Sequence, residues 1–337
     1  MRLYSGIDLH SNNCVLTVID EEGLTVYEKR VPNDIEVIKR ALLPHQEALV
    51  GTVVESTYNW YWLVDGLLDA NFKVHLANTT AIQQYSGLKH TNDKTDARWL
   101  AELLRLNILP KGYICPTDQR AIRDLARKRL QMISQRTRNL LSLQTLISRI
   151  TSKTMSCSSI KKLTEEQLQN ILTNPNNFFA ARSNLRLLKQ IISEEDVIKK
   201  EILCQIKPTP AYQKLTQVPG VGEILAITIM LETVDINRFD GVGNYASYCR
   251  CVGSKRESNG KKKGENNTKN GNKYLSWAFV EAANFAIRHY PTIKKFYQRK
   301  MSTRGRVVAI KSVAHKLARA SYHILKNGED FEIGKVF

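Results

Sequence analysis

The alternation of apolar and polar residues predicts a β-meander at the start of the chain. Three short runs, RLYSGID, NCVLTVID and LTVYEKR, have the period-two pattern of strands, and the turn Glu21-Glu22-Gly23 joins the last two as a hairpin. Asp34 is placed to cap a helix whose apolar face carries Ile35, Ile38 and Leu42.

Strands and helices then alternate. The Val-rich run Leu49–Val54 predicts a buried strand that ends at Glu55. We expect a helix over about 59–70, a short strand at Lys73–Leu76, and a helix from about Asp93 to Leu106. A meander followed by alternating helices and strands is typical of an α/β layer domain.

The remainder of the chain has helical periodicity. Residues 117–150 and about 160–205 predict long paired helices, or a coiled-coil arm, with basic faces that include Arg120, Arg123, Arg127 and Arg138. The last third is helical, with a terminal helix from about Gly305 to Lys326 capped by Gly328; we expect it to face a core with Val307, Val308, Val313 and Leu317. These patterns predict an α/β domain at 1–112, an arm at 113–207 and a mostly helical domain at 208–337.

Charge changes this picture by suggesting a partner. The 337 residues include 50 Lys and Arg against 32 Asp and Glu, a formal net charge of +18, and such an excess indicates a polyanion. The excess is uneven: residues 1–110 carry −4, 111–240 carry +8 and 241–337 carry +14. We therefore expect one part that grips phosphates and an acidic part that binds divalent metal ions.

Composition also excludes several classes of protein. No apolar stretch approaches a membrane span, and the start of the chain lacks the apolar run of a signal peptide. Six scattered cysteines argue against a disulfide framework or a zinc site. We expect a cytoplasmic protein with no membrane partner.

Four carboxylates form the first candidate site. Asp8 and Glu55 end strands, whereas Asp93 and Asp96 open a helix on one side of it. Together they could hold two divalent ions about 4 Å apart, the arrangement that activates both oxygens of a phosphodiester exchange. Alternatively, Asp93 and Asp96 serve only the helix terminus, and Asp8 is a turn residue. His10 and His75 are further ligand candidates, with solvent-facing or core positions as the alternative.

A glycine turn forms the second candidate site. Pro219-Gly220-Val221-Gly222 in LTQVPGVGEIL is typical of a helix-hairpin-helix, in which the N–H groups of the following helix bind a backbone phosphate. The alternative is an ordinary connection between two helices.

A polar loop, Ser254–Asn272, forms the third. It contains five Asn, three Gly and six basic residues, with nothing apolar, so a solvated flexible loop is the default. Its basic residues, which we expect to bind nucleic acid, are Lys255, Arg256, Lys261, Lys262, Lys263 and Lys269. They surround Ser258, a candidate nucleophile, with Ser254 as the alternative. Lys311, His315 and Arg319 recur along one side of the terminal helix, where phosphate contact or a solvated face would suit them.

The chain resembles the DEDD-type insertion-sequence transposases of the family numbered one hundred and ten, the bridge-RNA-guided recombinases. The resemblance rests on GIDLH, VVEST and KHTNDKTDARWLAELL around the four carboxylates. It continues through LTQVPGVGEILAITIMLE, NYASYCRCVGSKRESNGK and NTKNGNKYLSWAFVEAA in the second half, and it covers nearly the whole chain in order.

The resemblance implies a RuvC-like (RNase H-like) amino-terminal domain in which Asp8, Glu55, Asp93 and Asp96 coordinate Mg²⁺, with Mn²⁺ as a substitute. It implies that the serine matching Ser258 attacks DNA and forms a covalent phosphoserine intermediate. Many members have Gly directly after this serine, whereas Asn259 precedes Gly260 here, and Cys249–Gly253 replaces the usual Gly-Leu and Pro upstream.

The same resemblance implies the partners. An element-encoded guide RNA would pair with donor and target DNA, and a homodimer or homotetramer would bring one subunit's carboxylates to another's serine. It places the protein at the nucleoid of a prokaryotic cell.

Two other functions remain open. A RuvC-like nuclease or junction resolvase would use water as the nucleophile and Ser258 only as a phosphate contact. A non-catalytic scaffold for RNA or DNA would bind with steep salt dependence and would not need the carboxylates.

Overall fold

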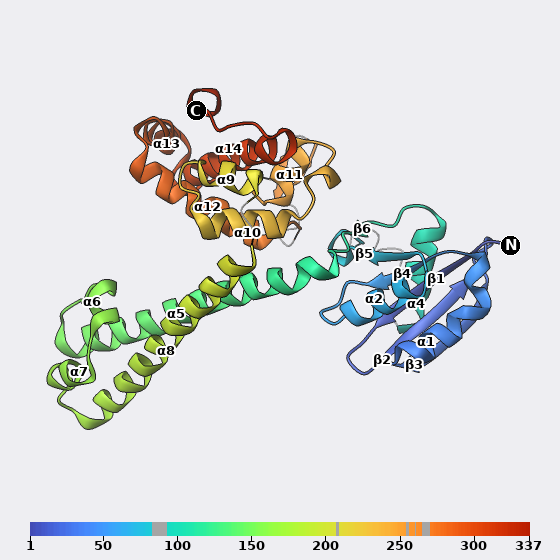
Figure 1. Cartoon of the computed structure of the whole chain (residues 1–337), viewed down its shortest axis with the longest axis horizontal. Helices are drawn as coiled ribbons and strands as arrows, with labels where there is room; N and C mark the ends of the chain where they lie inside the picture. The colour runs from blue at the N-terminus through green and yellow to red at the C-terminus, as the bar shows by residue number, and fades with distance from the viewer. Residues whose placement is uncertain (83–92, 207–208, 254–255, 260, 265–269) are drawn as a thin grey trace. The chain divides into compact units, whose positions relative to one another are not determined.

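The chain forms two compact units. The computed structural model describes residues 1–82, 93–206, 209–253, 256–259, 261–264 and 270–337. One unit consists of Met1–Thr117 with Lys255–Asn270, and the other of Asp118–Ser254 with Gly271–Phe337 (Figure 1).

A mixed sheet organises the first unit, with the strand order β3-β2-β1-β4-β5-β6. Strands β1 to β3 form an antiparallel meander, β4 and β5 run parallel to β1, and β6 is antiparallel to β5. The strands are β1 (Leu3–Leu9), β2 (Asn13–Ile19), β3 (Thr25–Pro32), β4 (Leu49–Glu55), β5 (Val74–Ala77) and β6 (Lys111–Gly112). The predicted α/β layer domain is confirmed.

Helices cover both faces of this sheet. Helices α1 (Ile35–Leu42) and α2 (Tyr61–Asp69) pack on the face of Ile7 and Leu16, and α4 (Asp93–Arg105) packs on the opposite face. Two short helices, η1 (Leu43–Ala48) and α3 (Thr79–Ile82), complete the domain. Coverage on both sides explains why every residue of β1 is buried. The Asp34 cap is also confirmed, because its Oδ1 accepts a 2.8 Å hydrogen bond from the Glu36 N–H.

Helix α4 lies close against β1 because Gly6 has no side chain. A Cβ at Gly6 would lie 2.0 Å from the carbonyl oxygen of Ala97. At the other end of α4, Arg105 Nη1 donates a 2.9 Å hydrogen bond to Glu21 O in the β2–β3 turn. That turn lies beside the start of β1, since Ile19 pairs with Tyr4. Helix α4 therefore runs antiparallel to β1, with its first turn towards the carboxyl end of the strand.

Two long helices form an arm in the second unit. α5 (Thr117–Thr151) and α8 (Pro175–Gln205) lie side by side and share an apolar cluster with the short helices α6 (Cys157–Lys162) and α7 (Glu165–Ile171) (Figure 1). The predicted pair of long helices is confirmed, but the second long helix starts at Pro175 rather than near residue 160. Thr164 begins α7 with a capping box and Asn174 caps α8 ahead of Pro175, so the chain turns twice.

Not all of the expected basic face on α5 is exposed. Arg120 is buried, with 4% of its surface exposed, while Arg138 is exposed as expected. Arg127 is only partly exposed because it pairs with a buried carboxylate of the second unit.

The rest of the second unit is a helical domain around one apolar core. Its helices are α9 (Pro210–Thr216), α10 (Glu223–Thr233), η3 (Ile236–Arg238), α11 (Val242–Tyr248), α12 (Lys273–His289), α13 (Pro291–Arg304), α14 (Arg306–Asn327) and α15 (Ile333–Val336). The expected Gly328 cap is confirmed, with φ +66° at that residue. No helix among the described residues is both long enough and apolar enough to span a membrane.

The expected core face of α14 is correct for its middle and wrong for its start. Val313 and Leu317 are fully buried, whereas Val307 is 70% exposed and Val308 49% exposed. Gly305, at φ +80°, begins the helix just before these two valines. The core contacts of α14 start only at Ala309, one turn later, so the helix begins outside the core.

We predict that Gly6→Ala destabilises the first unit by about 1–3 kcal/mol, because the new methyl group must displace the backbone of α4. Urea unfolding can be followed by fluorescence in a Trp277→Phe background, which leaves Trp60, Trp62 and Trp99, all in the first unit. Gly243→Ala is the matched control, since no atom lies within 4 Å of the Cβ position there. An unchanged Gly6→Ala midpoint would contradict the close approach of α4.

We also predict that the first unit loses stability as the pH falls from about 6.5 to 4. Burial, together with the charges of Lys111 and Lys73, lowers the pKa of His75 to about 4. The unfolded chain, with a His pKa of about 6.5, then binds the proton more readily than the folded chain in this window. In the same fluorescence assay, the free energy of unfolding should depend less on pH for His75→Gln than for the parent. Equal slopes of this free energy against pH would contradict the prediction.

Candidate active site

The strand register brings two of the predicted carboxylates to neighbouring positions. Ile7 of β1 pairs with Val54 of β4 in parallel, so Asp8 and Glu55 follow at the carboxyl ends of adjacent strands. Paired residues of neighbouring strands point to the same face, and this is the face that α4 covers. Asp8 is buried, with 4% of its surface exposed, and Glu55 is half-buried.

The first turn of α4 lies towards the same edge. Helix α4 runs antiparallel to β1 because Ala97 packs on Gly6 while Arg105, at the far end of the helix, contacts the β2–β3 turn. Asp93 is the first residue of the helix and Asp96 lies half-buried in its first turn. The ends of β1 and β4 and the start of α4 therefore lie towards one edge of the sheet, and they carry all four carboxylate positions. The Asp93 side chain lies outside the described part of the structure.

The surroundings of Asp8 suit a bound cation. Its Oδ2 is buried and accepts no hydrogen bond from the described residues. The His10 Nε2 lies 3.3 Å from Oδ2, in a contact that lacks hydrogen-bond geometry. A carboxylate oxygen is the ligand that hard divalent ions prefer, and a buried one without a donor is costly unless an ion or a proton satisfies it.

The described side chains do not by themselves complete a metal site. Among them, no group of three or more His, Cys, Asp or Glu is close enough to hold an ion. Asp93, the fourth predicted ligand, lies outside that test. His75 points away from this edge, because its ring lies beside Gly51 near the start of β4. Of the two histidines, only His10 is therefore near the carboxylates.

The charge of Asp8 also affects its neighbour Cys14. Burial, followed by the negative charge of Asp8, raises the pKa of the Cys14 thiol to about 12. In the second unit, burial raises the pKa of Cys251 to about 12, and the nearby Lys311 lowers it only slightly. The raised pKa keeps both thiols protonated at neutral pH, so they are weak nucleophiles.

The predicted polar loop contains a hairpin, so the expectation of a flexible loop is corrected. Strands β7 (Arg256–Ser258) and β8 (Lys261–Gly264) pair with Ser258 opposite Lys261, and Asn259 has φ +52°. Asn tolerates this left-handed conformation better than most residues, which allows the tight turn. Lys261 and Lys263 are exposed. The positions Ser254, Lys255 and Lys269, and the side chains of Arg256, Ser258 and Lys262, lie outside the described residues.

The glycine turn has a structural role at its first glycine. Gly220 has φ +81°, and a Cβ there would lie 2.1 Å from the carbonyl oxygen of Ala282 in α12. Gly222 caps α10 and faces open space, beside a cavity of about 500 Å³. Close packing thus explains Gly220, whereas Gly222 leaves the helix terminus accessible. On α14, Lys311 and Arg319 are exposed.

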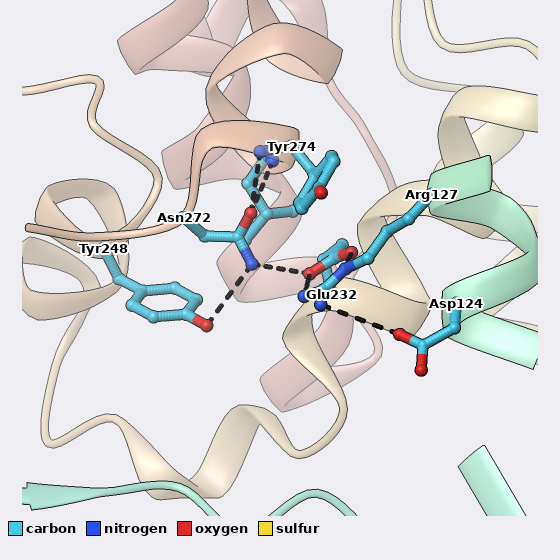
Figure 2. A network of polar contacts seen from close by, with 7 residues as sticks. Asp124, Arg127, Glu232, Tyr248, Asn272 and Tyr274 are labelled. Atoms are coloured by element: carbon cyan, nitrogen blue, oxygen red, sulfur yellow. Dashed lines mark hydrogen bonds and ion pairs between the residues drawn. The ribbon is translucent and has the colours of Figure 1, made fainter. Parts of the chain in front are cut away.

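Sequence reasoning missed a buried polar network in the second unit. Glu232 in α10 is 3% exposed, and Arg127 of α5 donates to both of its oxygens, at 2.6 Å and 2.7 Å (Figure 2). Asn272 donates a further 2.6 Å bond to Glu232 Oε2. The available signal was one acidic residue inside the apolar run ILAITIMLETV, which needs a buried partner.

Comparisons with protein families agree with this arrangement. Residues 5–151, which contain the four carboxylates, match a DEDD transposase model described as "Transposase". Residues 212–298, which contain Gly220, Gly222 and Ser258, match a model described as "Transposase IS116/IS110/IS902 family". No curated protein matches the sequence. The two matched regions span more than half of the chain in the expected order, and the protein belongs to the IS110 family of DEDD transposases, enzymes that act on DNA.

Proposed function

We propose that this transposase is an RNA-guided, site-specific DNA recombinase that cuts DNA by attack of Ser258 in the presence of Mg²⁺. The observation that carries the proposal is the neighbouring position of Asp8 and Glu55 at the edge to which the first turn of α4 points. The β7–β8 hairpin, which carries Ser258 and is called the serine hairpin below, belongs to the same compact unit as these carboxylates. This supports the proposal that Ser258 and the carboxylates act on one phosphodiester.

The residues have separate roles in this proposal. Asp8, Glu55, Asp93 and Asp96 hold the divalent ions, Mg²⁺ or in its place Mn²⁺, which supply charge stabilisation at the phosphate. The Ser258 oxygen forms a bond to phosphorus as the bond from phosphorus to one sugar oxygen breaks, and that oxygen gains the proton that the serine loses. Lys261 and Lys263, both exposed beside Ser258, neutralise the phosphate that approaches.

The family resemblance suggests the nucleic-acid partners, and the positive charge of the chain supports them. Residues 241–337 contain 20 Lys and Arg but only six Asp and Glu, and this basic region includes Lys311 and Arg319 on α14. We propose that it holds the backbones of donor DNA, target DNA and a guide RNA, with a homodimer or homotetramer as the working form. Gly222 at the start of α10 contributes a phosphate contact of the helix-hairpin-helix type. Three segments, 1–112, 113–207 and 208–337, divide this work as a RuvC-like catalytic domain, an arm and a helical DNA-binding domain.

We predict that Ser258→Ala abolishes a covalent protein–DNA adduct. The assay incubates the protein with labelled junction DNA, Mg²⁺ and RNA transcribed from the DNA that flanks the gene. Adducts are then separated under denaturing conditions. Ser254→Ala is the matched control and should form the adduct at the parent rate. An adduct that persists in Ser258→Ala, or disappears only in Ser254→Ala, would contradict the assignment. Nicks without any adduct would favour the nuclease that uses water.

We predict that Asp8→Asn weakens Mn²⁺ binding at least about tenfold and slows adduct formation by about 10²-fold or more, because a buried anionic ligand becomes neutral. Electron paramagnetic resonance of free Mn²⁺ measures the binding without any need for activity. Asp69→Asn, an exposed position in α2, is the control for the loss of one charge. Equal Mn²⁺ affinity in the parent and Asp8→Asn would exclude Asp8 as a ligand.

A further inference from the structure

The chain leaves the helical unit before the β7–β8 hairpin, which carries Ser258, and returns to it after the hairpin. The two segments at which it leaves and returns are hydrogen-bonded to each other. Asn272 N–H donates a 2.6 Å hydrogen bond to Tyr248 O, and Arg250 Nε donates a 3.1 Å bond to Gly271 O. Gly271 has φ +84°, and a Cβ there would lie 2.6 Å from Tyr248 O. We call Tyr248–Cys251 and Gly271–Asn272 the loop stem. Its geometry fixes where the chain starts and ends its excursion to Ser258.

Asn272 holds the stem to the rest of the unit through both ends of its amide. Its Oδ1 accepts hydrogen bonds from Tyr274 N–H and Leu275 N–H, at 2.8 Å and 3.0 Å, and so caps α12. Its Nδ2 donates to Glu232 Oε2 at 2.6 Å and to Tyr248 Oη at 3.3 Å. The side chain therefore has one orientation, with no donor or acceptor left to favour its flip.

Glu232 passes this constraint on to the long helix α5. Arg127 Nε and Nη2 bind the two oxygens of Glu232 in a fork, and the Arg127 guanidinium lies 4.6 Å from the centre of the Tyr274 ring (Figure 2). Asp124 lies 3.8 Å from Arg127 Nη1 on the solvent side. Burial would lower the pKa of Arg127, but the bonds and charge of Glu232 raise it above its usual value.

Stability alone does not explain such a network. Well-packed apolar residues usually replace a buried ion pair without loss of stability, whereas hydrogen bonds with fixed directions specify one arrangement of the elements that they join. The arrangement specified here joins α5, α10 and the loop stem, and the next residue of α10 is also fixed, since Thr233 Oγ1 lies 3.0 Å from the buried Tyr245 Oη.

We propose that Arg127, Glu232 and Asn272 are positioning residues for the serine attack: their network holds the loop stem in the orientation from which the hairpin presents Ser258. This inference rests on the proposed function, because it requires that Ser258 is the nucleophile. It also makes α5, the helix that forms the arm, a structural determinant of the reaction.

The test compares Asn272→Asp with the double variant Asn272→Asp/Glu232→Gln. Asp at 272 keeps the helix cap but places a carboxylate against Glu232. In the double variant the amide N–H of the glutamine at position 232 can donate to the new carboxylate, while its one oxygen still accepts from Arg127 Nε. With the DNA and RNA of the adduct assay, we expect Asn272→Asp to slow adduct formation about 10²-fold at saturating DNA, with less than a threefold change in the DNA dissociation constant. We expect the double variant to recover to within about tenfold of the parent.

Two further variants keep the result interpretable. Asn244→Asp makes the same substitution at an exposed site, where Asn244 Nδ2 donates to Asp240 at 3.2 Å, and should leave the rate unchanged. Asn272→Ser retains a good helix cap, so α12 stays intact, but loses the donation to Glu232; we expect at least a tenfold slower attack. Circular dichroism before the assay verifies that each variant is folded.

The outcomes separate the inference from the function on which it rests. A parent protein without a Ser258-dependent adduct would overturn the proposed function. A parent that forms this adduct, with Asn272→Asp and Asn272→Ser at the parent rate, would overturn only the positioning role. A slow Asn272→Asp that Glu232→Gln fails to rescue would overturn the proposed action of Glu232 through Asn272, and a parallel loss of DNA binding would reassign the network to binding.

Discussion

The close contact between α4 and β1 at Gly6 is the constraint on which the candidate site depends. Helix α4 can lie against the strand only because the backbone of Ala97 occupies the space of the missing side chain. The contact at Arg105 then fixes the direction of the helix, so its first turn can point only to the carboxyl end of β1. Residues some 85 to 90 positions apart in the sequence are directed to one edge by packing rather than by any attraction between them. Like charges do not attract, so packing has to bring the elements that carry these carboxylates to one edge.

Two buried carboxylates, one in each unit, differ in how the protein satisfies them. In the first, Asp8 is buried with an oxygen that accepts no hydrogen bond from the described residues, and a bound cation would stabilise it. In the second, Glu232 is fully satisfied by Arg127 and Asn272. The loss of one partner from such a pair costs about 3–5 kcal/mol, since the other charge stays buried. The open oxygen of Asp8 is thus available to a ligand, whereas the complete set of partners around Glu232 acts as a structural constraint.

The elements that sequence reasoning predicted correctly are those whose signal is local. The meander, the Asp34 cap and the buried strand ending at Glu55 each depend on alternation or on one side chain near its own backbone. We predicted that the carboxylate positions lie at one edge because α/β sheets place their chemistry at the carboxyl ends of strands, and because the family resemblance implies it. The close packing at Gly6 could not be predicted, because its cause, the backbone of Ala97, is distant in the sequence.

The wrong predictions share a different physical cause. Val307 and Val308 fit an apolar face by spacing, but spacing cannot tell where along a helix the core begins, and here it begins one turn later. Helical periodicity places Arg127 on a basic face, yet its side chain pairs with Glu232, more than a hundred residues away. Polar residues in long-range pairs escape pattern analysis because both partners must be found at once.

The loop stem restricts the segment that carries Ser258, the nucleophile in the function that we propose. A 20-residue excursion between Cys251 and Asn272 would be free to adopt many conformations if its ends were independent, and a nucleophile on such a chain would lose most of the advantage of proximity. Bonds across the stem, from Asn272 to Tyr248 and from Arg250 to Gly271, remove the freedom of the ends, and the β7–β8 pairing removes part of the rest.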